Sequence, residues 1–265
     1  MGTSTSYPGP VGGTGAHNRE WQRTRRRLTD LGKRLDNVLR GPGGPEGARQ
    51  LLNDRQDDIA AGLAAALRAH PSRALLVEPI TVQARALIDT LERLQLDGLV
   101  GIGVVGASPD ERELQFISAF LGDVSPGTVP EYAVRRGVRS TVETAIKDNA
   151  PLRAAVRSGD GGYRMPRELF CSIFQLFFAD AVRAFLRAVV AEHLKIALPV
   201  LYLDPTGLIA DAAAKKLVGL VPNPCEEERQ QPGPRRDSIA GTARSMVVRA
   251  VSQILDLDEQ ALEAA

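Results

Sequence analysis

The N-terminal amine is the group with the most direct chemistry in this 265-residue sequence. The first 18 residues are almost all Gly, Ser, Thr and Pro, so we expect a flexible tail. Removal of Met1 would leave the amine of Gly2, an unhindered nucleophile that another enzyme can modify. Gly2 and Ser6 also fit the loose myristoylation pattern, but no polybasic segment follows directly, and one myristoyl chain binds membranes only marginally.

A cluster of arginines offers a second kind of chemistry. The densest basic run contains Arg23, Arg25, Arg26 and Arg27, with Lys33 and Arg34 further along the same predicted helix. Guanidinium groups pair phosphates bidentately, so these residues are possible phosphate contacts of a nucleic-acid-binding module. The sequence favours an ordinary solvated helix face instead, because Trp21 is the only neighbouring aromatic residue for base stacking.

A glycine-rich turn matches the pattern of dinucleotide-binding loops. The segment Gly101-Ile102-Gly103-Val104-Val105-Gly106 reads G-x-G-x-x-G. A dinucleotide site needs a strand before the glycines and a helix that starts within them. Here a helix is predicted before the turn, and the next helix cap is Ser108. The context favours a flexible hinge between helices, and a nucleotide-dependent enzyme remains the alternative.

Other residues form no pattern that predicts catalysis or metal binding. His17, His70 and His193 lie far apart, and Glu192-His193 lacks the second histidine that a helical zinc site needs four residues later. Neither a nucleophile elbow nor a phosphate-binding loop with its lysine occurs. The carboxylates indicate no acid and base pair. We therefore expect no catalytic residues, no metal and no cofactor, in a protein that is not an enzyme.

The composition favours a helical protein without a strong overall charge. Hydrophobic residues make up 43% of the chain but aromatic residues only 5%, and Ala, Leu and Val dominate. Thirty-three basic residues nearly cancel 32 acidic ones, so binding to nucleic acid or to an anionic membrane must be local. The apolar stretch over 169–203 contains several charged residues, which favours a buried core helix over a membrane span.

Cysteine usage and the N-terminus predict a cytoplasmic location. Cys171 and Cys225 are the only cysteines, whereas a disulfide-stapled secreted domain needs several. We expect both to be reduced thiols. The chain does not open with a basic segment followed by an apolar one, so no signal peptide is predicted.

The hydrophobic periodicity predicts a mainly α fold, a multi-helix bundle-like domain behind a disordered Gly/Ser/Pro-rich tail. Helices are expected at 19–39, from 51 to before Pro71, at 81–96, from the Ser108 cap to Gly122, from 138 to near Pro151, and at 166–198, 205–218 and 238–262. Short strands are possible at 75–77 and 200–203, but two such runs do not make a sheet. The predicted organisation is a tail (1–18), a helical domain (19–221), an exposed linker (222–236) and a docked C-terminal helix (237–265).

The leader resembles that of a known family. Its opening residues read Met1-Gly2-Thr3-Ser4-Thr5-Ser6-Tyr7-Pro8-Gly9-Pro10, followed by Gly12-Gly13-Thr14. This start is similar to the M-G-T-S-x-S-Y-G-G-P leader of the QatB family, the B components of bacterial Qat anti-phage defence operons. Pro8 stands where the family has glycine. The match covers about a tenth of the chain, and the helix around Phe177-Phe178-Ala179-Asp180 agrees only in general character.

The resemblance implies a role in defence beside three partners: an ATPase, a QueC-like enzyme and a TatD-like nuclease. It also implies that the QueC-like enzyme joins a 7-deazaguanine to the N-terminal glycine, which corresponds to Gly2 here. The physical properties of the tail are compatible with this modification but do not by themselves suggest it.

Overall fold

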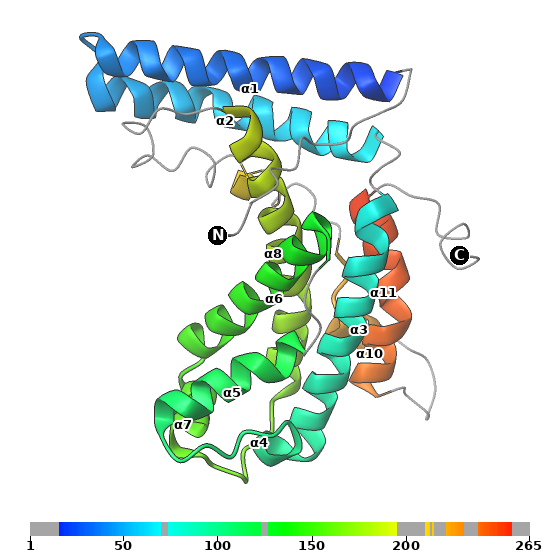
Figure 1. Ribbon diagram of the computed structural model, residues 1–265. Helices are drawn as coiled ribbons and strands as arrows, with labels where there is room; N and C mark the ends of the chain where they lie inside the picture. Colours follow the sequence, from blue (N-terminus) through cyan, green and yellow to red (C-terminus); the bar gives the residue numbers. More distant parts are fainter. Residues whose placement is uncertain are drawn as a thin grey trace. The chain divides into compact units, whose positions relative to one another are not determined.

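The computed structural model describes residues 16–69, 74–122, 127–194, 210–212, 214, 221–230 and 238–255. Within these ranges the regular elements are α-helices and no strand occurs, which confirms the predicted mainly α fold (Figure 1). Gly2, His70 and most of the predicted helix at 205–218 lie outside the described residues.

The chain divides into two compact units. Unit 1 comprises Met1–Leu76 and Val182–Gly219, and unit 2 comprises Val77–Ala181 and Leu220–Ala265. The predicted single domain over 19–221 therefore falls across both units. Sequence periodicity identifies helices but carries no information on which helices share a core, so it does not define this division.

Unit 1 contains a helical hairpin. Helices α1 (Ala16–Arg40) and α2 (Gly44–Ala69) run antiparallel and side by side after the predicted glycine-proline break (Figure 1). The buried side chains of the pair include Leu28, Leu31, Leu35, Leu52 and Ile59. The hydroxyl of Thr24 on α1 donates a 3.1 Å hydrogen bond to the carbonyl of Gly62 on α2. Helix α8 (Arg167–Leu194) continues into unit 1, where Arg183 pairs with Asp211 at 2.8 Å.

Unit 2 is built around the first half of α8. Its other helices are α3 (Ala74–Leu96), α4 (Gly98–Gly101), α5 (Pro109–Leu121), α6 (Val129–Asp148), α7 (Ala150–Ser158), α10 (Pro224–Gln230) and α11 (Ile239–Leu255). The largest fully buried side chains of this unit are phenylalanines on α5 and α8, at positions 116, 120, 170, 174, 177 and 178. The segment Arg167–Arg187 of α8 is long and apolar enough to cross a membrane, but most of it is buried, as in a core helix.

Local capping sets where several helices begin. The Ser108 hydroxyl accepts the backbone N–H of Glu111, and Pro109 occupies the first helical position, as the sequence predicts. Thr128 and Glu131 form a capping box at the start of α6. Pro151 was expected to follow the end of a helix, but it lies in the first turn of α7, which Asn149 caps. Proline fits that turn because its missing N–H has no intrahelical partner there.

The region predicted as a possible strand at 75–77 is helical. Helix α3 begins at Ala74, before the predicted start at 81, and includes Pro79. A short apolar run cannot distinguish a strand from a buried helical segment, and this ambiguity explains the error.

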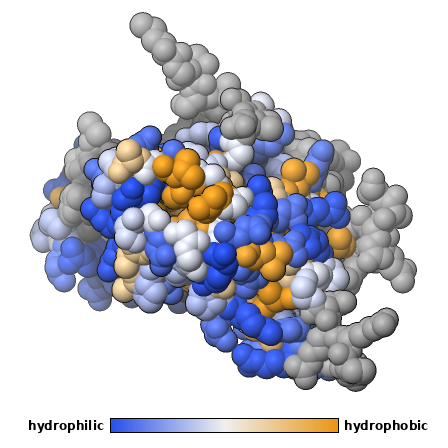
Figure 2. All heavy atoms as spheres, turned by 90° about the horizontal axis from the view of Figure 1, so that it is seen from below, coloured by the Kyte–Doolittle hydropathy of each residue, from blue (hydrophilic) through white to orange (hydrophobic). Residues whose placement is uncertain are grey.

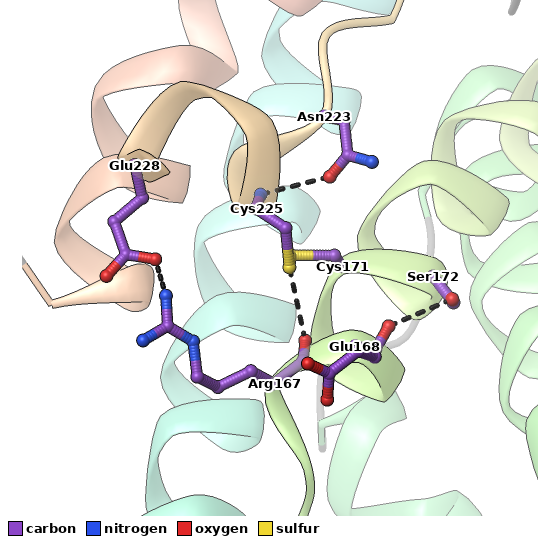
Figure 3. The surroundings of a disulfide bond; sticks show 7 residues. All are labelled: Arg167, Glu168, Cys171, Ser172, Asn223, Cys225 and Glu228. Atoms are coloured by element: carbon purple, nitrogen blue, oxygen red, sulfur yellow. Dashed lines mark hydrogen bonds and ion pairs between the residues drawn. A yellow bond between two sulfur atoms is a disulfide. The ribbon is translucent and has the colours of Figure 1, made fainter. Parts of the chain in front are cut away.

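The C-terminal region differs most from the prediction. Cys171 and Cys225 form a disulfide, with their Cα atoms 6.0 Å apart, so the predicted reduced thiols are wrong (Figure 3). Residues 224–230 of the predicted exposed linker form α10, in which Pro224, Cys225 and Glu228 are buried. The remaining residues of that linker, 231–237, lie outside the described residues. The sequence did not predict this helix, because its composition is charged and proline-rich. The contacts that stabilise it involve residues far away in the sequence. The disulfide closes a loop of 54 residues. In the chain-entropy model, closing such a loop contributes about 4 kcal/mol to the free energy of unfolding.

Helices α3 and α11 are joined by charged side chains. The guanidinium of Arg244 on α11 binds Asp89 at 2.7 Å and also binds Glu92, both on α3. Hydrogen bonds to Glu92 and Asp89 raise the pKa of Arg244 above its usual value. Arg244 is therefore charged at neutral pH.

Helix α6 approaches α8 closely at Gly137. A Cβ atom at this position would lie 2.6 Å from the backbone N and Cα atoms of Ala181. One turn further along α6, the buried Thr141 hydroxyl donates a 3.0 Å hydrogen bond to the buried Asp180 carboxylate. Because Gly137 has no side chain, α6 and α8 lie close enough for the hydrogen bond between Thr141 and Asp180. A larger distance between the helices would weaken this bond.

We predict that Gly137→Ala lowers the free energy of unfolding by about 1–3 kcal/mol, because overpacking against backbone atoms forces the two helices apart. Alanine otherwise favours a helix by about 1 kcal/mol over glycine, so the expected sign opposes the intrinsic preference. Urea unfolding measures the change. The control is Arg136→Ala at the exposed neighbouring position, which should change stability by less than about 0.5 kcal/mol. Stabilisation by Gly137→Ala would rule out the close approach.

Candidate functional site

The basic residues singled out by the sequence lie on α1, away from its buried stripe. The helix carries eight basic and three acidic residues, whereas its partner α2 carries three basic and four acidic ones. Arg23, Arg26 and Arg27 are exposed, as is Lys33. Arg25 belongs to the same helix, but its side chain lies outside what the structure describes. Because the leucines of α1 are buried, the cations are left on the outward side.

Three of these cations have no ion-pair partner among the described residues. Arg34 pairs with Asp30 at 3.4 Å in the preceding turn, whereas Arg26, Arg27 and Lys33 make no such pair within the described part of the chain. They line an open hollow of about 710 Å³ together with Gln22, Thr29 and Asp30. The hollow presents amide, hydroxyl and cationic donors on one helix face. These are the groups that contact phosphate oxygens in nucleic-acid complexes.

Acidic side chains limit the positive charge at one edge of this surface. A second hollow of about 370 Å³ contains Arg27, Arg34 and Arg55, but Asp30 and Asp58 line it as well. The strongest positive potential is therefore expected at Arg26, Arg27 and Lys33 rather than between α1 and α2. Trp21, the candidate stacking residue, has a side chain outside the described part of the structure.

In the glycine-rich turn at 101–106, the backbone N–H groups donate hydrogen bonds to acceptors within the protein. The amides of Ile102, Gly103 and Val104 donate to carbonyls of Leu99 and Val100. The next amides are bound by side chains of α5: those of Val105 and Gly106 donate to Gln115 Oε1 at 2.9 and 2.8 Å, and that of Ala107 donates to Glu111 Oε2 at 3.0 Å. A pyrophosphate in such a loop needs free amides. Within this turn, the donors from 102 to 107 are already engaged.

Arg112 fixes the same turn from its carbonyl side. Its guanidinium donates to the carbonyls of Gly106 and Ala107 at 2.8 and 3.1 Å, and also to those of Val156 and Arg157 at the end of α7. The last carbonyls of a helix lack intrahelical partners, so this side chain satisfies acceptors on two segments at once. The predicted flexible hinge is thus a tied connection between α4, α5 and α7.

An apolar groove in unit 2 was not identified from the sequence. It has a volume of about 720 Å³, and its apolar lining includes Pro79 and Val82 of α3, Phe120 and Leu121 of α5 and Val134 of α6. Val82 is 60% exposed. In the sequence, Val82 is an apolar residue outside the main apolar stripe of the predicted helix at 81–96, and this was a local signal for the groove. The spatial neighbours come from segments about 40 residues apart, so the sequence did not indicate their convergence.

Three polar side chains of the groove, Gln83, Glu131 and Arg135, bind its own walls. Gln83 donates to the carbonyl of Phe120 at 3.0 Å, and Arg135 donates to that of Gly122 at 3.0 Å. Glu131 accepts the N–H groups of Gly127 and Thr128 as part of the capping box. These groups hold α3, α5 and α6 in register. The geometry fits a contact surface better than a reaction centre, because the polar atoms are used for support.

Exposed apolar side chains also occur at the end of unit 2 near α4. Leu96, Val100 and Val105 are each more than 60% exposed. Figure 2, which views the molecule from the end where α4 and α7 lie, shows apolar side chains in separate patches between hydrophilic ones. Separate patches of this kind are common on protein surfaces.

No group of three or more His, Cys, Asp or Glu side chains suited to a metal ion is found among the described residues. No family model, no curated protein and no solved structure matches this chain. The leader resemblance and the geometry of the described residues therefore carry the functional inference.

We predict that Gln115→Ala speeds hydrogen exchange at Val105 and Gly106 and lowers the free energy of unfolding by about 0.5–1.5 kcal/mol. The reason is that two backbone donors lose their shared acceptor. Exchange followed by NMR or mass spectrometry, together with urea unfolding, measures both effects. Leu114→Ala is the matched control, since Leu114 is the adjacent residue on α5 and is 64% exposed. Unchanged exchange at both amides would contradict the role assigned to Gln115.

Proposed function

We propose that this chain is a non-enzymatic component of a bacterial anti-phage defence system. In this proposal the helical body docks on partner proteins, and the leader presents Gly2 for modification with a 7-deazaguanine. The observation that carries the proposal is the leader Met1–Pro10, which resembles that of the QatB family. The partners are an ATPase, a QueC-like modifying enzyme and a TatD-like nuclease. The protein acts in the cytoplasm, with neither a membrane partner nor a cofactor of its own.

The chemistry of the leader supports this proposal. After removal of Met1, the nitrogen of Gly2 is a primary amine beside a carbon without a side chain. The following residues are mostly Gly, Ser, Thr and Pro, which offer little apolar surface to bury. A segment of this composition can enter the active site of a modifying enzyme without the unfolding of a packed core.

Two surfaces of the body suit docking. Unit 2 has the apolar groove between α3, α5 and α6, and unit 1 has the exposed cations of α1. An apolar groove supported by fixed polar groups is typical of a peptide or helix contact. Both surfaces are far from Gly2 in sequence, so docking and modification can be separated by mutation.

We expect the protein purified from cells that express the complete operon to lack Met1 and to carry a mass increase on its N-terminal peptide. The increase should equal one 7-deazaguanine adduct, because the glycine amine is the acceptor. Intact-mass and peptide mass spectrometry measure it. Expression without the gene for the QueC-like enzyme is the control and should give unmodified Gly2. An unmodified terminus in the presence of all partners would exclude Gly2 as the modified residue.

A nucleic-acid-binding module is the second candidate function. It is favoured by one specific observation, the exposure of Arg26, Arg27 and Lys33 on one face of α1 without ion-pair partners among the described residues. Such a surface binds phosphates through counterion release and gives an affinity that falls steeply with salt.

We predict that the triple variant Arg26→Ala/Arg27→Ala/Lys33→Ala weakens binding to duplex DNA, if this second function holds. The slope of log affinity against log salt should decrease by about 2 to 3, because three phosphate contacts are lost. Fluorescence anisotropy at several salt concentrations measures the slope. The variant Arg85→Ala/Arg136→Ala/Lys147→Ala removes the same charge from exposed positions of unit 2 and should have a smaller effect. Salt-independent binding, or none by the wild-type protein, would reject this function.

A further inference from the structure

Helix α10 packs against α11, and its link to α8 depends largely on the disulfide. It contains seven residues, Pro224–Gln230, and isolated helices shorter than about 12 residues are marginal in water. Its buried residues are Pro224, Cys225 and Glu228. Cys225 belongs to the disulfide and Glu228 carries a charge, so Pro224 is the one other apolar side chain that α10 buries.

Two ion pairs complete the attachment of α10. Glu228 pairs with Arg167 at the start of α8 (Figure 3). Glu227 pairs with Arg249 on α11. The Glu228 side chain is 6% exposed, whereas that of Arg167 is 53% exposed. A buried carboxylate is tolerated only while its cation is held nearby. The Arg167–Glu228 pair therefore assists the disulfide in holding α10 against α8, whereas the Arg249–Glu227 pair holds α10 against α11.

The disulfide also lies at a particular point in the chain path. Cys171 and Cys225 are 54 residues apart and both belong to unit 2. Between them, Val182–Gly219 belongs to unit 1. The disulfide thus closes a covalent ring of the chain from Cys171 to Cys225, which contains all of Val182–Gly219. Reduction of the disulfide opens this ring.

We propose that Cys171 and Cys225 form a reversible thiol–disulfide switch that releases α10 from α8 when it is reduced. The reductant is a small cellular thiol such as glutathione, or a protein dithiol. Its thiolate attacks Cys225 Sγ and forms a mixed disulfide, and Cys171 leaves as a thiolate and takes a proton. A second reductant thiolate then attacks the reductant sulfur and frees Cys225. The net reaction transfers two electrons and two protons to the pair and oxidises two reductant thiols to one disulfide.

The burial of the pair determines how the switch responds. Cys171 and Cys225 are 3% and 6% exposed, so a reductant reaches them when α10 opens locally. A seven-residue helix with one apolar anchor can open in this way without unfolding unit 2. Disulfides in the cytoplasm of most organisms are redox-sensing or catalytic rather than permanent. The switch is independent of the proposed modification of Gly2.

The test uses the full-length oxidised protein in glutathione mixtures that range from fully oxidised to the ratio of the cytoplasm. Thiols are trapped by alkylation and counted by mass spectrometry, while hydrogen exchange is followed in peptides from 224–230 and 129–148. At the cytoplasmic ratio we expect both cysteines to be alkylated. Exchange in α10 should rise on the order of tenfold or more, with little change in α6. Reoxidation with oxidised glutathione should restore protection.

Two outcomes would overturn the proposal. One is a pair that stays oxidised at the cytoplasmic ratio, and the other is a reduced protein whose α10 remains as protected as before. The double variant Cys171→Ser/Cys225→Ser provides a second measurement: it should resemble the reduced protein and ignore glutathione. If circular dichroism shows that this variant does not fold, reduction and reoxidation of the wild-type protein decide the question.

Discussion

The buried aromatic face of α8 is the constraint on which unit 2 depends. Phe174 and Phe178 lie one turn apart with ring centroids separated by 5.1 Å, and Phe177 contacts Phe178 at 5.0 Å. Such pairs contribute about 0.5–1.5 kcal/mol each beyond the area that they bury. Apolar side chains surround this part of the helix, so other elements must cover it on several sides. Helix α6 does so through the close approach at Gly137, and α10 does so through the bond to Cys171.

The sequence predicted the features that depend on neighbouring residues. The start of α5 at Ser108 and the core character of α8 follow from capping and composition within one or two turns. The outward position of the α1 arginines follows from the spacing of its leucines. Features formed by distant residues were missed. Neither the approach of Gly137 to Ala181 nor the pairing of Cys171 with Cys225 has a local signal, because each partner looks ordinary by itself.

The same distinction applies to the candidate sites. The glycine pattern at 101–106 is local, and the sequence correctly placed it between helices. What the turn does depends on Arg112 and Gln115 of α5, whose side chains bind the backbone of residues 105 and 106, six to ten residues earlier in the chain. A phosphate-binding loop and a tied connection can share one glycine pattern. The difference is whether the amides face a ligand or an internal acceptor.

The disulfide and the predicted cytoplasmic location constrain each other. A permanent disulfide is expected in an oxidising compartment, whereas the proposed function places the protein in the cytoplasm. The disulfide is compatible with that proposal when it is reversible and anchors a short helix rather than the core of the unit. The position of Cys225 on α10 meets that condition, since α10 contributes few buried side chains to unit 2. Loss of the bond then removes its contribution to stability and releases α10 from α8, while the aromatic packing of α8 continues to hold the rest of the unit.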